Sequence, residues 1–230
     1  MWKLEFNNET NENYEILATR PKIPCSSFKK EFKNVPGRDG VLCVVSKEIE
    51  DVTISVKFHF VCKRNDWMKK FRNAKKWLLS GGKELLFSDD PDYFYRVKNV
   101  TVGVAEREVK EVGEFEVDFL CYGSQYFKDG KNEVDYSKVK YNPGIFSQPI
   151  YIIKGEGMCT LTVNGKSVTA NVGQNLTIDT ERMISYRGDG VLQNTAIKGN
   201  YEDLYLQEGD NKITVTDGFE CKVIPRWRCL

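Results

Sequence analysis

A strand that runs directly into a helix, at residues 51–82, constrains the fold of this chain more than any other stretch. From Val52 to Cys62 every second residue is apolar, and the intervening residues are mostly polar. Side chains along a strand point alternately to its two faces, so this alternation predicts a half-buried β-strand. Apolar residues then recur at helical spacing, at Trp67, Phe71, Ala74 and Leu78. We expect one helix, at about residues 65–80, packed by this stripe on one face of a sheet.

Polar and small residues mark both ends of the expected helix. Asn65 or Asp66 can serve as its N-cap, because a short polar side chain accepts hydrogen bonds from free backbone amides. Ser80, Gly81 and Gly82 follow the last apolar position. Glycine adopts the left-handed conformation that a C-terminal cap needs, so the helix is expected to end there.

The side of the helix away from its apolar stripe is basic. Its positive residues are Arg64, Lys69, Lys70, Arg72, Lys75 and Lys76. Such a face either contacts phosphates by charge or is an ordinary solvated surface. Because no aromatic residues are interleaved on it for stacking, a solvated surface is favoured.

The composition excludes several classes of protein. The 230 residues are 40% hydrophobic, which suits one large domain or two small ones, and the net charge of +1 predicts no strong attraction to nucleic acid or membrane. Seven cysteines without a Cys-x-x-Cys pair favour buried reduced thiols over a disulfide framework or a zinc cluster. Met1 leads directly into an alternating strand, so we expect no signal peptide and assembly in a reducing cytoplasm.

The hydrophobic pattern divides the chain in two. It dissolves between Lys128 and Gln148, so we predict a first domain at residues 1–130, a linker at 131–148 and a second domain at 149–230. The second domain shows only short strands between turns, with Asn164-Gly165 as a strong hairpin signal, which is typical of a small β-sandwich. In the first domain, the apolar run from Val41 to Val45 predicts a short buried strand.

No constellation of residues predicts catalysis. His59 and Cys62 leave opposite faces of their strand, which excludes a dyad between them. Asp89, Asp90 and Asp92 are either a calcium or carboxylate site or a turn, and the lack of a pivot glycine and of a downstream glutamate favours the turn. We therefore expect no catalytic residue, no metal and no cofactor.

Ten short motifs occur in an order that resembles one known family. In the first half these are Pro36-Gly37-Arg38-Asp39-Gly40, Lys76-Trp77-Leu78, Leu85-Leu86-Phe87, Asp89-Asp90-Pro91-Asp92-Tyr93 and Phe115-Glu116-Val117-Asp118-Phe119. In the second half they are Asn142-Pro143-Gly144, Pro149-Ile150, Gly155-Glu156-Gly157, Gly209-Asp210-Asn211 and Ile224-Pro225-Arg226-Trp227. Their joint order is similar to that in the distal tail proteins of bacteriophages with long, non-contractile tails.

The resemblance implies a two-domain, mainly β fold with one helix in the first domain. An N-terminal β-sandwich or split-barrel-like domain would form a ring of six copies, alone or as two stacked rings. A C-terminal galectin-like or carbohydrate-module-like β-sandwich would face outward. The ring would join the tail tube to the adsorption apparatus at the virion tail tip, around a channel through which DNA passes. Partners implied are the tail tube protein, a tail-associated or tail fibre protein and receptor-binding proteins.

Two surfaces are candidates for these roles. A closed ring needs a head-to-tail contact between different patches of neighbouring copies. Exposed sheet edges can form such a contact, because their backbone groups can pair with another chain. We expect the type II turn formed by Pro36, Gly37, Arg38, Asp39 and Gly40, with its flanking strands, to lie at that contact. The alternative function is a carbohydrate-binding module that recognises host glycans. It would use exposed aromatic residues of the second domain, for which Tyr151, Tyr186 and Trp227 are the candidates.

Overall fold

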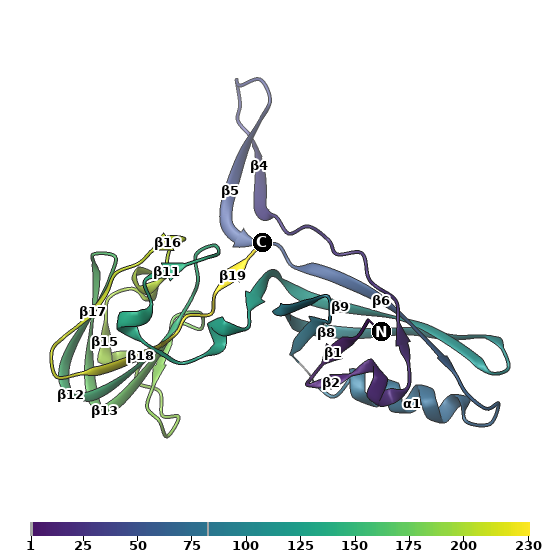
Figure 1. Cartoon of the computed structure of the whole chain (residues 1–230). Helices are drawn as coiled ribbons and strands as arrows, with labels where there is room; N and C mark the ends of the chain where they lie inside the picture. The colour runs from purple at the N-terminus through teal and green to yellow at the C-terminus, as the bar shows by residue number, and fades with distance from the viewer. Residues whose placement is uncertain (1, 82) are drawn as a thin grey trace. The chain divides into compact units, whose positions relative to one another are not determined.

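The computed structural model describes residues 2–81 and 83–230, except for the side chain of residue 108. The chain divides into two compact units (Figure 1). Unit 1 comprises residues 1–125 together with Leu230, and unit 2 comprises residues 126–229. Both are built mainly from β-strands, and the described part of the chain has one α-helix, which lies in unit 1.

Unit 1 is organised on an eight-stranded sheet whose main path has the order β2-β1-β7-β8-β9-β6-β3. These strands are β1 (Leu4–Phe6), β2 (Glu9–Thr10), β3 (Leu17–Ala18), β6 (Val52–Val61), β7 (Glu84–Phe87), β8 (Asp90–Val109) and β9 (Val112–Phe127). The eighth strand, β19 (Arg228–Cys229), pairs with β9 off this path. Its residues belong to unit 2, which β9 enters at Tyr126. A short 3₁₀ helix, η1 (Asn11–Tyr14), joins β2 to β3.

The strand predicted from alternation is β6, and the prediction is confirmed. It pairs antiparallel with β9 along its whole length, from Val52 opposite Cys121 to Val61 opposite Val112. Its alternate residues from Val52 to Phe60 are buried. Since the inward residues of β9 alternate in the same way, the two strands present one continuous apolar face.

The helix that follows is α1 (Trp67–Leu78), within the predicted range. Trp67, Ala74 and Leu78 are buried, as the helical stripe predicts, and Phe71 is half-buried. Asp66 takes the N-cap position, although its side chain makes no capping hydrogen bond. Gly81 has a φ of +83°, the left-handed conformation expected after the helix, whereas Gly82 lies outside the described residues.

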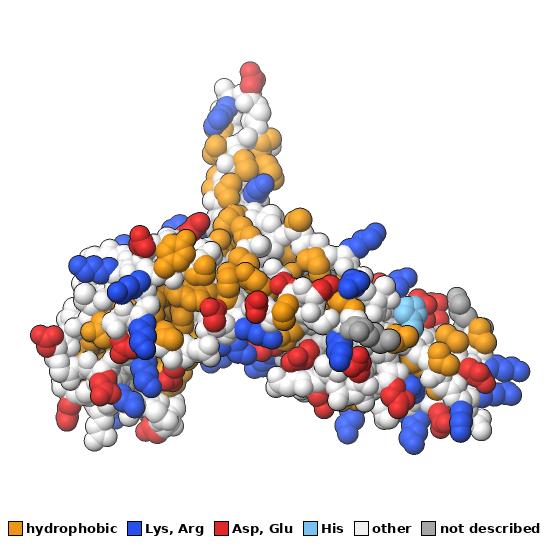
Figure 2. Space-filling model, viewed as in Figure 1, with side chains coloured by type: hydrophobic (Ala, Val, Ile, Leu, Met, Phe, Trp, Pro, Cys, Tyr) orange, Lys and Arg blue, Asp and Glu red, His pale blue; other side chains and the backbone are white. Residues whose placement is uncertain are grey.

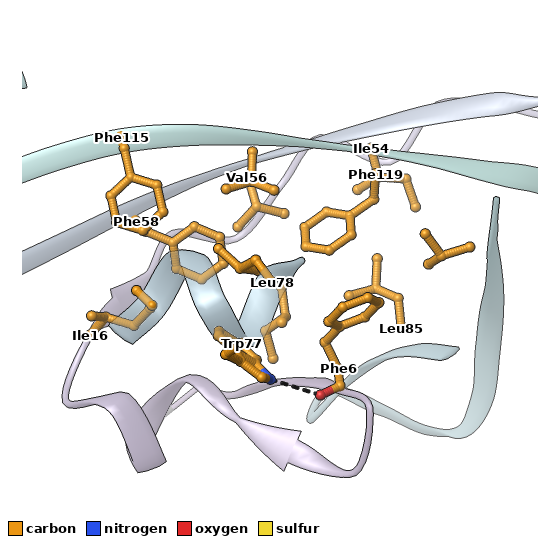
Figure 3. Close-up of a cluster of buried hydrophobic side chains, with 14 of the residues drawn as sticks. Phe6, Ile16, Ile54, Val56, Phe58, Trp77, Leu78, Leu85, Phe115 and Phe119 are labelled. Atoms are coloured by element: carbon orange, nitrogen blue, oxygen red, sulfur yellow. Dashed lines mark hydrogen bonds between the residues drawn. The ribbon is translucent and has the colours of Figure 1, made fainter. Parts of the chain in front are cut away.

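Trp77, which the stripe of four did not include, is the central side chain of the unit 1 core. Figure 3 shows it among apolar residues from the sheet, close to Phe6. Its indole Nε1 donates a hydrogen bond of 2.9 Å to the Phe6 carbonyl, and its ring stacks on Tyr14 with a centroid distance of 4.9 Å. The indole is therefore satisfied although it is almost completely buried.

Unit 2 is built around a long hairpin, β12 (Ile150–Val163) and β13 (Lys166–Asp179), which turns at Asn164-Gly165 as predicted. The other strands are β10 (Val134–Asp135), β11 (Tyr141–Asn142), β14 (Ile184–Tyr186), β15 (Ile197–Lys198), β16 (Gly209–Asp210), β17 (Ile213–Val215) and β18 (Glu220–Ile224). Four 3₁₀ helices complete it: η2 (Asp129–Lys131), η3 (Tyr136–Lys138), η4 (Asn194–Ala196) and η5 (Tyr201–Leu204).

Both ends of the long hairpin pack into one core. β18 pairs with the first half of β12 and β17 with the last, and the inward residues of both halves belong to the same buried cluster. Between the halves, Gly157 has a φ of +105°. A Cβ on Gly155 would lie 2.4 Å from the Phe219 ring. Only glycine fits these two positions, where the strand pairing changes from β18 to β17.

Residues 131–148, expected to form a linker, contribute to unit 2 instead. They contain β10, η3 and β11, and Val139 is buried in the core of the unit. Asn142 is also buried and ties down the following turn, because its side chain accepts from the Gly144 amide and donates to the Ile145 carbonyl. The polar turns that suggested a linker are held by specific hydrogen bonds of this kind.

Candidate functional site

A separate two-stranded sheet of unit 1 carries the predicted turn at residues 36–40. Its strands are β4 (Phe28–Asn34) and β5 (Val41–Ile49), which pair antiparallel with each other and with no other named strand of the described chain. In Figure 1 this hairpin stands apart from the eight-stranded sheet. We call residues 28–49 the arm.

The turn at the tip of the arm has the predicted type II features. The Arg38 amide donates a hydrogen bond of 3.2 Å to the Val35 carbonyl, and Gly37, at the third position, has a φ of +77°. Every residue from Pro36 to Gly40 is exposed. Within the described chain, neither Arg38 nor Asp39 has a side-chain ion pair. The tip thus presents both charges to solvent.

One face of the arm carries a row of uncovered apolar side chains. The register places Phe32 opposite Cys43, with Val41 and Val45 on the same face beside their partners Asn34 and Lys30. Phe32 is 69% exposed, Val45 56% and Val41 54%, and Cys43 is also exposed. We call these four residues the arm face. The prediction of a buried strand at residues 41–45 is therefore wrong, because no second layer of the described chain covers it.

The rest of the arm is equally open. Val35 and Val44 are also exposed, and the Lys29–Glu48 and Lys33–Glu31 ion pairs on the arm are solvent-exposed. Figure 2 shows apolar side chains along the hairpin. Because the sheet has only two strands, each has an outer edge of backbone groups without a strand partner. Exposed edges and large exposed apolar residues together are typical of a surface that another chain covers.

His59, in β6, and Cys62, just after the end of this strand, have different partners. His59 Nδ1 lies 3.3 Å from a Glu114 oxygen, and its Nε2 lies 3.2 Å from the Thr19 hydroxyl. Cys62 packs against the core instead. The prediction that the two side chains leave opposite faces is thereby confirmed.

Asp89 has a structural role in the aspartate-rich turn. It accepts a hydrogen bond of 2.8 Å from the Trp2 indole and one of 3.1 Å from Arg20. The hydrogen bond from Trp2 is the main cause that lowers the pKa of its carboxyl, and Arg20 adds to it. In the described residues no group of three or more histidine, cysteine or acidic side chains has a geometry that could hold a metal ion.

The basic face of α1 borders a cavity of about 940 Å³ in unit 1. Lys69, Lys70 and Lys76 line it, but so do Glu9 and Glu15. Lys70 forms a 2.9 Å ion pair with Glu15, and the other two lysines are exposed to solvent. This mixture of charges agrees with a solvated surface and gives no uniform track for a phosphate backbone.

Two of the three aromatic residues proposed for a glycan surface are not at the surface. Tyr151 is fully buried, and Trp227 is also part of the unit 2 core. Both lie on strands or segments whose inward face packs on the sandwich, so the prediction of exposed aromatics at these positions is wrong. Tyr186, in β14, is half-buried. The three do not form a shared platform for stacking on a sugar.

Replacing Tyr151 by phenylalanine should lower the free energy of unfolding by about 1–3 kcal/mol. The Tyr151 hydroxyl donates a 2.7 Å hydrogen bond to the Leu204 carbonyl, and the phenylalanine would leave that buried oxygen without its donor. Urea denaturation of the full chain would measure the loss. Tyr186→Phe is the matched control and should change stability by less than about 0.5 kcal/mol. Equal effects of both changes would contradict the buried role of Tyr151.

Comparisons with known proteins agree with this architecture. Residues 6–121 match the family model described as the phage tail protein RIFT-related domain. The sequence matches no curated protein significantly. None of the described helices is long and apolar enough to cross a membrane.

Two solved structures have the same fold. The first is the Dit protein (gp 19.1) of phage SPP1, described as a paradigm of the hub adsorption apparatus in phages that infect Gram-positive bacteria. The TM-score is 0.73 at 12% identity, with 97% of each chain covered. The second is a chain of the phage P2 baseplate in its activated conformation with Ca. The TM-score is 0.50 at 10% identity, with 100% of this chain and 97% of that chain covered. The expected two-domain, mainly β fold is confirmed.

Proposed function

Because this chain belongs to the phage tail protein family with a RIFT-related domain, we propose that it is the distal hub of a phage tail. The hub joins the tail tube to the adsorption apparatus at the tail tip. The fold shared with SPP1 Dit over nearly the whole chain supports this role, since SPP1 Dit is itself described as a paradigm of a hub adsorption apparatus. The observation that carries the proposal is the arm, an exposed apolar hairpin for which the described chain provides no cover.

The hub assembles as a ring of six copies through unit 1, as one ring or two stacked rings. In a ring each copy offers two different patches, one to each neighbour. The arm is one of these patches, with Pro36 to Gly40 at its tip and the arm face along its strands. Its open strand edges supply backbone hydrogen bonds to the neighbour, and its apolar face supplies buried area. DNA passes through the central hole without being held.

The hub has a structural role and no catalytic residues. Its partners are further copies of itself, the tail tube protein, a tail-associated or tail fibre protein and receptor-binding proteins. It assembles in the host cytoplasm and ends in the tail tip of the virion. The alternative of a carbohydrate-binding module is weakened, because two of its three aromatic residues are buried.

Replacing two residues of the arm face should dissociate the ring. We expect the purified protein to have about six times the subunit mass of 26.5 kDa, or a multiple of it, in multi-angle light scattering. The double change Phe32→Ser and Val45→Thr replaces two side chains of the arm face that are each more than half exposed. Truncating a hot-spot residue at the centre of an interface costs about 2 kcal/mol or more. With Phe32 in that role and Val45 beside it, the variant should run as a monomer at micromolar concentration.

The matched control is Val191→Thr with Leu192→Ser, two comparably exposed apolar residues of unit 2. It should keep the mass of the ring. Circular dichroism should show that both variants are folded, because neither changes a buried residue. A native protein that remains monomeric at millimolar concentration would refute the ring, and a full ring in the arm variant would remove the arm from its contact.

The charges at the tip of the arm can be tested separately. Arg38→Ala with Asp39→Ala removes both charges and leaves the two glycines of the turn unchanged. If the tip lies in the contact, subunit association should weaken by about tenfold, measured as the midpoint of dissociation on dilution. An unchanged midpoint would place the contact on the strands of the arm alone.

A further inference from the structure

A polar cavity of about 320 Å³ lies on the outer face of the unit 2 sheet. Its floor is formed by β12 and β13, at Met158, Asn171 and Gly173, and Lys198 of β15 borders it. The loop after β14 forms a wall with Arg187, Gln193 and Thr195. Among the residues that the structure describes, no acidic side chain lines the cavity, whereas two cationic side chains do. Neither Arg187 nor Lys198 has an ion pair in the described chain.

The wall of the cavity is held in place by hydrogen bonds. The Ser185 amide donates to the Asn194 side chain at 2.8 Å, and the Gln193 amide donates to the Ser185 carbonyl at 2.7 Å. The Gly188 amide donates to the Asn175 side chain of β13 at 2.6 Å. The loop is thus tied both to itself and to the sheet beneath it. A site whose walls are fixed before binding loses less entropy when a ligand enters.

Gly173 is what lets the arginine reach the floor of the cavity. A Cβ at this position would lie 2.9 Å from Arg187 Nη2. The guanidinium group therefore lies directly over the strand, in the space that a side chain would otherwise fill. The cross-strand neighbour of Gly173 is Glu156, which does not line the cavity. The arginine thus lies beside a sheet surface and neutral polar groups, and no described carboxylate forms an ion pair with it.

We propose that this cavity binds a phosphorylated polyol or sugar. A guanidinium fork and an ammonium group offer more donors than the two oxygens of a carboxylate can use, and they suit the tetrahedral oxygens of a phosphate. Asn171, Gln193 and Thr195 add neutral polar groups for hydroxyls. The volume exceeds that of a bare phosphate and is at the lower end of small-ligand sites. No aromatic side chain is among the described lining residues, so the recognition is by charge and hydrogen bonds.

The test is binding to the full-length protein, measured by isothermal titration calorimetry with glycerol 3-phosphate and with a glycerol phosphate polymer. Glycerol and inorganic phosphate are the comparison ligands. We expect saturable, salt-sensitive binding of the phosphorylated polyol and none of glycerol. Stronger binding of the polymer than of the monomer would identify a polymeric source, and equal binding per phosphate would identify the free monoester. Inorganic phosphate that binds as well as glycerol 3-phosphate would overturn the polyol part of the proposal.

Three substitutions test whether the ligand binds in this cavity. Arg187→Ala and Lys198→Ala should each weaken binding by about ten- to hundredfold, since each removes a charge-assisted contact. Gly173→Ala keeps both charges but displaces the guanidinium, and it should also weaken binding. The matched control is Lys212→Ala, an exposed lysine of unit 2 outside the cavity, which should bind normally.

Failure of this site is distinguishable from failure of the hub. Binding is measured on the native protein in whatever oligomer it forms, and none of the three substitutions touches the arm. The proposal is overturned if no phosphorylated ligand binds saturably, or if Arg187→Ala binds as well as the native protein.

Discussion

Replacing Arg226 by alanine should lower the free energy of unfolding by about 3–5 kcal/mol. Arg226 binds Asp179 through both nitrogens of its fork, with Nη1 at 2.8 Å from Oδ1 and Nη2 at 3.1 Å from Oδ2. The Asp179 side chain is only 2% exposed. Without the arginine, a buried carboxylate would remain without its main partner, and Glu181, now 3.1 Å from Arg226, would add repulsion.

This contribution should depend on pH with a definite sign. Burial by itself raises the pKa of Asp179, but the hydrogen bonds and charge of Arg226 outweigh it and lower the pKa below its ordinary value of 3.8. The pair therefore stabilises the fold above pH 3.8, and the stabilisation is lost as the pH falls through the lower pKa of the folded state. The difference between native and variant stability should be constant near neutral pH and shrink in acid.

The matched control is Arg182→Ala. Its guanidinium is 3.9 Å from Asp179 and 68% exposed, so this change should cost less than about 1 kcal/mol. Arg226→Lys should fall between the two, because lysine keeps the charge but loses the two-pronged contact. Urea denaturation at several pH values measures all three. Equal losses for Arg226→Ala and Arg182→Ala would show that the buried pair does not stabilise unit 2.

The second large effect is expected at the centre of unit 1, where Trp77→Ala should cost about 3–5 kcal/mol. The indole fills the space between α1 and the sheet, stacks on Tyr14 and makes edge contacts with Phe6 and Phe58. Alanine would leave a cavity and free the Phe6 carbonyl from its donor. Because the affected core belongs to the unit that carries the arm, we also expect the variant to assemble poorly.

Two further variants separate the causes of this loss. Trp77→Phe fills most of the space but cannot donate to Phe6, so its cost reports mainly the buried hydrogen bond. Met68→Ala, on the same helix and exposed, should change stability by less than about 0.5 kcal/mol. Fluorescence-detected denaturation of the full chain gives each value. A Trp77→Ala protein as stable as Met68→Ala would contradict the central position of the indole.

The candidate assembly surface was only half predictable. The turn at residues 36–40 follows from Pro36-Gly37 chemistry, and the structure has its hydrogen bond and its left-handed glycine. The same sequence suggested that residues 41–45 are buried, because an apolar run has no feature that separates a covered strand from an exposed one.

The cavity in unit 2 was not predicted at all, since Arg187 and Lys198 lie on separate segments and carry no shared motif.

Local pattern alone determined the β6 strand, the helix that follows it and the turn at Asn164-Gly165. In each case the alternation, the stripe or the dipeptide acts through neighbours within a few residues, so its effect is written in the sequence. Tertiary structure alone decided that Trp77 is the centre of a core, that Tyr151 is buried and that the arm is bare. Those outcomes depend on whether a second layer, distant in sequence, covers a given face, and side-chain periodicity carries no information about that layer.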